Sequence, residues 1–337
     1  MKKKKIIASA AVLLAGIGIY KFVRSQQNSS NAEDNWTTAN IPDLTAKVII
    51  VSGANSGIGF EEAKEFARKG AQVILACRSM DKAQAALDEI LAEIPDASAE
   101  IMPLDLASLS SVRQFAEAFK MKYDRLDVLA NNAGIMMVPY RTTEDGFESQ
   151  FGTNHLGHFA LTGLLIDLIK ATPASRVVNV SSGAHRFGKM DFDNLMFPGG
   201  NDYSPTAAYG RSKLANLLFT YELQRRLEAA GADVIAVAAH PGIANTNLAT
   251  HLINKKLLKL AKPLLDVFMQ SAAMGALPTI RAAVNPDVCG GQYYGPGGFK
   301  EQRGYPVLVD SNEASQNLAN AQQLWQVSEQ LTGVQYL

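Results

Sequence analysis

The chain has 337 residues, of which 47% are hydrophobic and 19% charged, and its 32 Lys and Arg balance its 32 Asp and Glu. This composition excludes collagen-like, disordered and disulfide-stapled chains, and the length suits one large α/β domain or two small ones. Residues 1–24 carry six basic side chains and no acid, so the rest of the chain has an acidic excess that disfavours nucleic acid as a partner.

The first segment of the chain is basic and then apolar. The lysines at 2–5 precede Ile6–Tyr20, a run of 15 residues without a charge. As a helix this run is about 22 Å long, shorter than the ~30 Å hydrocarbon core, but an extension to Val23 would let Lys21 reach the headgroups. Because no small-residue cleavage site follows, we expect residues 1–24 to be an uncleaved membrane anchor. A cleaved signal and a buried helix are the alternatives.

The chain after the anchor divides into a linker and a folded body. Residues 25–42 are rich in Ser, Asn, Gln and Thr, which is typical of a polar linker, and residues 43–337 are expected to form the domain. We predict strands at 47–52, 72–76, 99–102, 127–130, 176–180, 233–238 and 292–294. We predict helices at 58–69, 80–94, 108–123, 146–170, 206–230 and 271–284. This alternation indicates an α/β fold, a doubly wound Rossmann-like parallel sheet that binds its ligands beyond the carboxyl ends of the strands.

A glycine-rich turn joins the first predicted strand to the first helix. Its residues are Gly53, Asn55, Ser56, Gly57, Ile58 and Gly59. Glycines let the backbone approach a pyrophosphate, and the helix N-terminus supplies amide donors. The spacing is G-x-x-x-G-x-G, and glycine-rich turns also occur for purely structural reasons. The position between a strand and a helix favours a dinucleotide site.

The ends of the next strands indicate which dinucleotide binds. Arg78 follows the second strand, where an acid would hold the ribose of NAD, and positions 72–78 contain no Asp or Glu. An arginine there accommodates a 2′-phosphate, so we expect NADP (NADPH) rather than NAD; a solvated surface arginine is the alternative. After the third strand, Asp105 and Leu106 are placed to reach the adenine edge. Asn132, after the fourth strand, is expected to support the sheet beside the cofactor.

Tyr209 and Lys213 are the candidate catalytic pair. They lie four residues apart at the start of a predicted helix, so their side chains share one face. A neighbouring ammonium and a bound cofactor can lower the pKa of the tyrosine, which then donates a proton to a carbonyl oxygen or accepts one from an alcohol. Ser182 ends the fifth strand and can bond the same oxygen, with Ser181 as the competing assignment. Asn154 is expected to link Lys213 to a water relay or simply to pack.

Two further segments follow the sixth strand. Pro241, Gly242 and Thr246 form a P-G-x-x-x-T turn that could contact the cofactor, or serve only to reverse the chain. Residues 243–268 alternate leucines with lysines. This pattern predicts an amphipathic basic helix, suited to covering an apolar substrate or resting on anionic lipid, although an ordinary solvated helix gives the same pattern.

The remaining histidines and cysteines are expected to be structural. His155 and His158 lie on one helix, but no third ligand is near in sequence, so core or interface histidines are favoured over a metal site. Cys77 and Cys289 are too few for a disulfide framework, and we expect both to be reduced and buried. No metal is expected.

The order of these motifs resembles that of the short-chain dehydrogenase/reductase family, over roughly residues 43–335. The motifs are the glycine loop, the Asn-Asn-Ala-Gly stretch at 131–134, Asn154, Ser182, Tyr209 with Lys213, and Pro241-Gly242. In that family the catalytic tetrad is Asn, Ser, Tyr and Lys, which implies Asn154, Ser182, Tyr209 and Lys213 here. Ser52 stands where Thr is more usual in the loop, and both residues carry a hydroxyl.

A closer resemblance is to the retinol dehydrogenase-like branch, with its protochlorophyllide reductase and WW-domain oxidoreductase relatives. The stretches at 76–78, 153–159 and 209–216 carry it. Ser182 and Tyr209 are 27 residues apart, more than is common in the family, and the extra stretch at 185–206 is expected to form a wall of the substrate pocket. The resemblance implies NADP(H) and apolar carbonyls or alcohols, such as retinoid-, steroid- or lipid-like compounds.

These observations predict an NADP(H)-dependent alcohol dehydrogenase or carbonyl reductase with Tyr209 as its general acid and base. A non-catalytic NADP-binding sensor or scaffold on the same fold is the alternative, and a sugar-nucleotide epimerase would need a larger C-terminal domain. Expected partners are the small apolar substrate and, through residues 1–24, membrane lipid; a homo-oligomer is left open. The positive-inside rule would place the body outside, whereas NADPH is supplied in the cytoplasm. We therefore expect a membrane-associated enzyme facing the cytoplasm.

Overall fold

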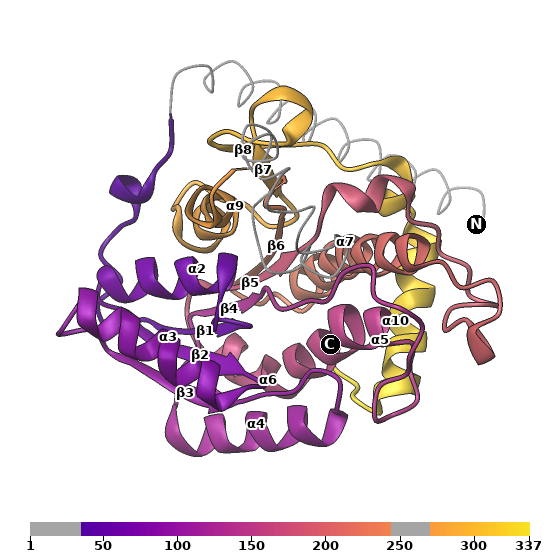
Figure 1. Ribbon diagram of the computed structural model, residues 1–337, viewed down its shortest axis with the longest axis horizontal. Helices are drawn as coiled ribbons and strands as arrows, with labels where there is room; N and C mark the ends of the chain where they lie inside the picture. Colours follow the sequence, from indigo (N-terminus) through magenta and orange to yellow (C-terminus); the bar gives the residue numbers. More distant parts are fainter. Residues whose placement is uncertain (1–34, 244–269) are drawn as a thin grey trace, which may run out of the picture. The chain divides into compact units, whose positions relative to one another are not determined.

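The computed structural model describes residues 35–243 and 270–337 (Figure 1). The chain divides into two compact units, Met1–Trp36 and Thr37–Leu337. The predicted anchor at 1–24 and Thr246 lie outside the described residues, as does all but the first residue of the predicted helix at 243–268. Within the described ranges, no helix is both long enough and apolar enough to cross a bilayer.

The strands of the described domain form one sheet in the order β3-β2-β1-β4-β5-β6-β7-β8. Their bounds are β1 (Val48–Ser52), β2 (Gln72–Cys77), β3 (Ala99–Pro103), β4 (Val128–Asn131), β5 (Ser175–Val180), β6 (Val234–Ala239), β7 (Tyr293–Pro296) and β8 (Pro306–Leu308). All pairs are parallel except β7 with β8. The strand order reverses between β1 and β4, and such a switch point is where doubly wound sheets bind ligands. The predicted Rossmann-like α/β fold is confirmed.

Helices cover both faces of the sheet. Their bounds are α2 (Gly57–Arg68), α3 (Met80–Glu93), α4 (Leu109–Lys122), α6 (Gly157–Ala171), α7 (Pro205–Ala229), α9 (Ala272–Val284) and α10 (Leu318–Thr332). On one face α2 packs against α9, and on the other α4 packs against α6 and α7 against α10 (Figure 1). Strands such as β1 are buried on both faces, which is why they are continuous apolar runs in the sequence.

The structure differs from the sequence expectations in three elements. The predicted helix at 146–170 is broken into α5 (Ser149–Phe151), the π-helix η2 (Gly152–Leu156) and α6. Strand β8 and helix α10 were not predicted, because β8 is a three-residue edge strand and α10 buries a narrow face that includes Ala321, Leu324 and Trp325. The final strand of the sheet is therefore β8, which runs antiparallel to β7.

The two cysteines are both free, but only one matches the expectation. Cys77 is buried at the end of β2, and burial raises the pKa of its thiol to about 11. Cys289 is exposed in the turn before β7, so the prediction of a buried thiol there is wrong. The described residues contain no group of three potential metal ligands.

Candidate active site

Two cavities meet at the carboxyl ends of the central strands. The smaller, about 200 Å³, is lined by the glycine turn, by residues 132–135 after β4, and by Lys213. The larger, about 830 Å³, is lined by the turn after β5, by residues 240–243 after β6, and by residues 300–302. Ile58, Tyr209 and Pro241 line both cavities. The candidate acid–base tyrosine therefore stands on the wall that the two cavities share.

The backbone of the glycine turn packs too closely on its neighbours to accept side chains at Gly53 and Gly59. Gly53 has a φ of +72°, which suits glycine, and a Cβ atom on Gly59 would lie 2.4 Å from Nδ2 of Asn132. The side chain of Ser56, the residue before α2, makes no capping hydrogen bond. The first amide groups of α2 are therefore not capped by Ser56. They lie at the positive end of the helix dipole, beside the smaller cavity.

Ser52 fixes the end of β1 to the neighbouring strand. Its hydroxyl oxygen accepts hydrogen bonds of 3.0 Å from the amides of Asn132 and Ala133, and lies 2.9 Å from Nε2 of His158. The Nδ1 atom of His158 lies 3.1 Å from the carbonyl oxygen of Asn154, so the ring donates there and accepts from Ser52. Burial lowers the pKa of His158 to about 4, which keeps the ring neutral. This histidine is structural, as expected.

Asn154 lies in the π-helix η2 and is fully buried. Its Oδ1 atom accepts from the amide of Ile135 over 2.8 Å, and its Nδ2 atom donates to the carbonyl of Ile135 and to the hydroxyl of Ser212, both over 2.9 Å. A Cβ atom on Gly134 would lie 3.1 Å from Oδ1 of Asn154 and 3.6 Å from Nζ of Lys213. The asparagine therefore ties the loop after β4 to α7 beside the lysine.

Tyr209, Lys213 and Ser182 come together at the shared wall. The Nζ atom of Lys213 lies 5.8 Å from the ring centre of Tyr209, and burial lowers the pKa of this lysine to about 8. Burial raises the pKa of Tyr209, and a hydrogen bond with the side chain of Ser182 partly offsets this effect. The hydroxyl of Ser181 instead donates to the carbonyl of Lys213 over 2.8 Å. Of the two serines, Ser182 is the one that faces the tyrosine.

Other predicted cofactor residues lie outside the lining of the two cavities. Arg78 is exposed directly after β2, and no ion pair of its side chain occurs within the described parts of the chain. Asp105 is half-buried, and its Oδ1 atom accepts from the amide of Ala107 over 3.0 Å in its own turn. Leu106 is buried, and its carbonyl oxygen would be 2.4 Å from a Cβ atom on Gly157. These residues border the sheet end rather than the reacting centre.

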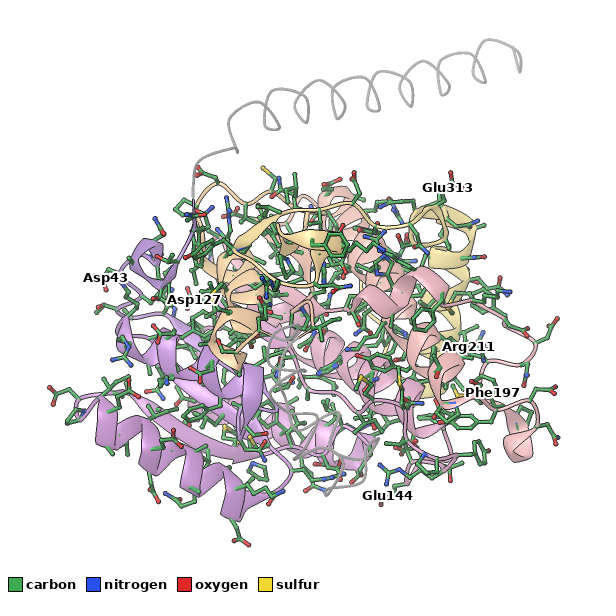
Figure 2. The ribbon with its side chains drawn as sticks, turned by 45° about the horizontal axis from the view of Figure 1, so that its top comes forward. Asp43, Asp127, Glu144, Phe197, Arg211 and Glu313 are labelled. Carbon is green, nitrogen blue, oxygen red and sulfur yellow. The ribbon has the colours of Figure 1, made fainter. Side chains whose placement is uncertain are left out.

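The stretch at 185–206 contributes less to the pocket than the sequence suggested. Only Arg186 and Phe187 from it line the larger cavity. Further along, the guanidinium of Arg211 lies 4.2 Å from the ring centre of Phe197 and donates to the carbonyl of Leu195 over 2.8 Å (Figure 2). Most of the predicted wall is therefore anchored to α7 instead.

The loop between β7 and β8, residues 297–305, contributes lining residues that the sequence did not lead us to expect. Lys300, Glu301 and Gln302 from this loop line the larger cavity, together with His240 from the end of β6. The apolar lining residues are Ile58, Met136, Met137, Ala184, Phe187, Pro241 and Ile243. Three glycines in a charged stretch between two apolar runs were the available signal for a hairpin.

Comparisons with known proteins agree with this geometry. The family model described as short chain dehydrogenase matches residues 47–257. Retinol dehydrogenase 14 of Mus musculus is 38% identical over 346 residues, covering 98% of this chain and 99% of that protein. Polyprenol dehydrogenase of Homo sapiens is 42% identical over 300 residues, covering 87% of each chain. A crystal structure of an uncharacterized protein from Mycobacterium paratuberculosis has a TM-score of 0.74 at 43% identity, covering 90% of this chain and 99% of that one.

Proposed function

The chain belongs to the short-chain dehydrogenase family, and we propose that it interconverts an apolar alcohol and its carbonyl with NADP(H), Tyr209 being the general acid and base. Membership makes it an NAD(P)-dependent oxidoreductase that acts on CH–OH groups. The observation that carries the finer proposal is the place of Tyr209, on the wall between a glycine-lined cavity and an apolar one. A proton donor at that wall can serve a substrate on one side while a cofactor is held on the other.

The residues of the smaller cavity fit a dinucleotide. The glycines at 53, 57 and 59 line this cavity without side chains, and α2 presents N-terminal amide donors suited to a pyrophosphate. When bound, the nicotinamide supplies or accepts the hydride. Gly53, Gly57, Asn132, Pro241 and Lys213, which line this cavity, would hold the dinucleotide.

The proton chemistry belongs to the chain's own side chains. In the reducing direction the Tyr209 hydroxyl donates its proton to the carbonyl oxygen, while the hydroxyl of Ser182 bonds the same oxygen. The Lys213 ammonium, fixed beside the ring, stabilises the tyrosinate that remains. Asn154 keeps the loop after β4 and the start of α7 in register, so that the lysine stays in place. In the oxidising direction the same groups act in reverse.

The preference for NADP rests on Arg78. This arginine is exposed immediately after β2, and no acid lies between positions 72 and 78. A guanidinium at this strand end can pair with a 2′-phosphate, whereas NAD would need an acceptor for its ribose hydroxyl.

The apolar substrate class rests on the larger cavity. Its volume of about 830 Å³ suits a small organic molecule, and its lining is mostly apolar on the side of Met136, Met137 and Phe187. Relatives named for retinol and for polyprenol share 38% and 42% identity with this chain. Retinoid-, steroid- or lipid-like alcohols and aldehydes are therefore the compounds to test first.

A substrate panel tests this proposal. The purified protein is mixed with NADPH or NADH and with retinal, aliphatic aldehydes or ketosteroids, and the loss of nicotinamide absorbance is followed. We expect turnover of apolar carbonyls with NADPH. Binding of NADPH without turnover of any carbonyl, and without oxidation of the matching alcohols by NADP, would contradict it and favour a non-catalytic role.

We further propose a place for the protein in the cell. Residues 1–24 would anchor it to a membrane, residues 25–42 would act as a linker, and residues 43–337 would form the catalytic domain on the cytoplasmic side. The basic and apolar composition of residues 1–24 supports the anchor, and the supply of NADPH supports the orientation.

A further inference from the structure

The hairpin loop between β7 and β8 has a strained backbone where it meets the larger cavity. Lys300 has a φ of +50° and Glu301 a φ of +56°, in the left-handed region that residues with a Cβ atom seldom adopt. Lys300, Glu301 and Gln302 all line the cavity. Two consecutive residues in this conformation persist only where the surrounding contacts hold them.

Glu301 is the centre of those contacts. Both of its carboxylate oxygens accept hydrogen bonds from Nη2 of Arg186, over 2.9 and 2.8 Å. Its Oε2 atom lies 3.2 Å from Nε2 of His240. His240 accepts from the amide of Gly242 at Nδ1, over 3.3 Å, and Nε2 is the ring nitrogen that faces the carboxylate. Burial tends to raise the pKa of Glu301, but His240 and Arg186 together hold it below its ordinary value.

The place of His240 is built into the sheet. The side chain is buried, and a Cβ atom on Gly295 of β7 would lie 2.0 Å from its Nε2 atom. Only glycine at that position of β7 leaves room for the imidazole. The imidazole ring therefore occupies the space that a side chain on Gly295 would fill, and its Nε2 atom lies close to Glu301.

The partners of Glu301 belong to the two chain segments that carry the reacting centre. Arg186 lies in the short helix η3 (Gly183–Phe187), which follows Ser182 directly. His240 directly precedes Pro241, which lines both cavities. Glu301 thus joins the hairpin to the serine side and to the cofactor side of the site.

Backbone hydrogen bonds within the loop, from the amide of Glu301 to Gly298 and from that of Gln302 to Phe299, shape its tip, and further contacts attach its C-terminal half to the chain after β6. The amide of Ile243 donates to the carbonyl of Gln302 over 2.8 Å. The side chain of Gln270 bridges the carbonyl of Pro241 and the amide of Gly304 over 2.7 and 3.1 Å. These bonds hold the C-terminal half of the loop, and the ion pair of Glu301 with Arg186 attaches its tip to η3.

We propose that Glu301 is a positioning residue that, through Arg186 and His240, fixes the β7–β8 hairpin as a wall of the substrate cavity and thereby favours long apolar substrates. This inference rests on the proposed function. A short aldehyde held by Tyr209 and Ser182 leaves most of the 830 Å³ unfilled, whereas a long one extends along the apolar lining as far as the hairpin, whose position limits the length of the cavity.

The test compares butanal with dodecanal, each with NADPH, in the full-length protein and in Glu301→Gln. We expect the ratio of kcat/KM for dodecanal to kcat/KM for butanal to fall about threefold to tenfold, through KM rather than kcat, since the pair is partly exposed. Arg186→Gln should reproduce the fall. The matched control is Glu100→Gln, which breaks the pair between Glu100 of β3 and Lys122 of α4, outside both cavities, and should leave the ratio unchanged.

Hydrogen exchange gives a readout that does not depend on turnover. In Glu301→Gln the amides of Ile243 and Gly298, which are bonded within or onto the hairpin, should exchange faster than in the wild type. An unchanged aldehyde ratio, an equal loss for both aldehydes, or unchanged exchange would each overturn the inference. If the wild type reduces neither aldehyde nor any other carbonyl, the proposed function fails, and the exchange experiment still decides whether Glu301 holds the hairpin.

Discussion

The buried ammonium group of Lys213 donates a hydrogen bond of 3.0 Å to the carbonyl oxygen of Val180, the last residue of β5. The same carbonyl accepts a second bond from Nδ2 of Asn216, one turn further along α7. Two side chains of α7 are thus attached to the strand end that presents Ser182. The relative positions of lysine, tyrosine and serine are set by this attachment, so the site depends on the contact between β5 and α7.

Replacing the tyrosine tests its proposed chemical role. Tyr209→Phe removes the hydroxyl but keeps the ring that packs over Lys213, so folding and cofactor binding should persist. Loss of general acid–base catalysis should lower kcat by about 10²–10⁴. Steady-state rates on a verified substrate, with NADPH affinity measured by fluorescence, check this. Tyr123→Phe is the matched control, because among the described residues its hydroxyl bonds only Glu100, and neither residue lines the two cavities. Near-normal turnover by Tyr209→Phe would refute the mechanism.

The arginine after β2 is the residue that we propose to select NADP, and its replacement tests this role. Arg78→Ala should weaken NADPH binding much more than NADH binding, because a charge-assisted contact with the 2′-phosphate is worth about 1.5–3 kcal/mol, or roughly tenfold to a hundredfold in affinity. Titration of both cofactors by calorimetry measures the difference. Arg68→Ala removes another exposed arginine, at the far end of α2, and should affect neither cofactor. An equal loss for both cofactors would remove Arg78 from the 2′-phosphate site.

Deleting the first 24 residues tests the proposed anchor. The described domain begins after this segment, so the shortened protein should be released from the membrane fraction and keep its activity. The full chain should stay in that fraction after a high-salt wash, because insertion is not screened by salt. Protease added to intact spheroplasts then reports the orientation. Digestion of the catalytic domain from outside would contradict its cytoplasmic placement.

Much of the fold was accessible from the sequence because parallel strands are buried on both faces. The apolar runs that became β1, β2 and β6 are uninterrupted, and each is followed by a polar or glycine-rich turn at the ligand-binding end of the sheet. Residues that follow strands could therefore be assigned to one region without knowing their contacts. The helical period alone predicts that the side chains of Tyr209 and Lys213, four residues apart, lie on one face of a helix.

The rest depended on tertiary contacts that no local pattern encodes. Glu301 meets Arg186 and His240 across more than sixty positions of the chain. The predicted helix is interrupted around Asn154 by a π-helix. Its wider turn is not visible in the spacing of apolar residues, so the sequence did not predict the interruption. The sequence of helix α10 is mostly polar. Its narrow apolar face, which includes Trp325, is identified only by its contact with α7 in the folded domain.

Buried histidines predict a loss of stability in mild acid. Burial lowers the pKa of His155 to about 3 and of His158 and His185 to about 4, whereas in the unfolded chain they titrate near the ordinary value of 6.5. Between these values the unfolded state binds more protons, so stability falls as the pH is lowered, by up to about 1.4 kcal/mol per pH unit for each histidine. Urea unfolding at several pH values measures the slope. His155→Gln should make it shallower; an unaltered slope would show that His155 does not contribute.

Glu62 predicts a pH effect of the opposite sign. This residue of α2 is fully buried against α9, and among the described residues neither carboxylate oxygen has an aligned hydrogen-bond partner. Burial raises its pKa to about 8, which the hydroxyl of Thr279 offsets only in part. The folded state therefore keeps a proton that the unfolded chain releases above about 4.5, and stability falls as the pH rises through this window.

The variant Glu62→Gln removes this titration while keeping the shape of the side chain. Its stability relative to the wild type should increase from pH 5 to pH 8, by on the order of 3 kcal/mol, because only the wild type must hold a proton against a rising pH. Urea unfolding of both proteins across that range gives the difference directly. The neighbouring Glu61→Gln, whose carboxylate is partly exposed and pairs with Lys64, should show no such trend. A flat difference for Glu62→Gln would mean that the carboxyl group is already ionised in the folded protein and that α2 and α9 accommodate its charge.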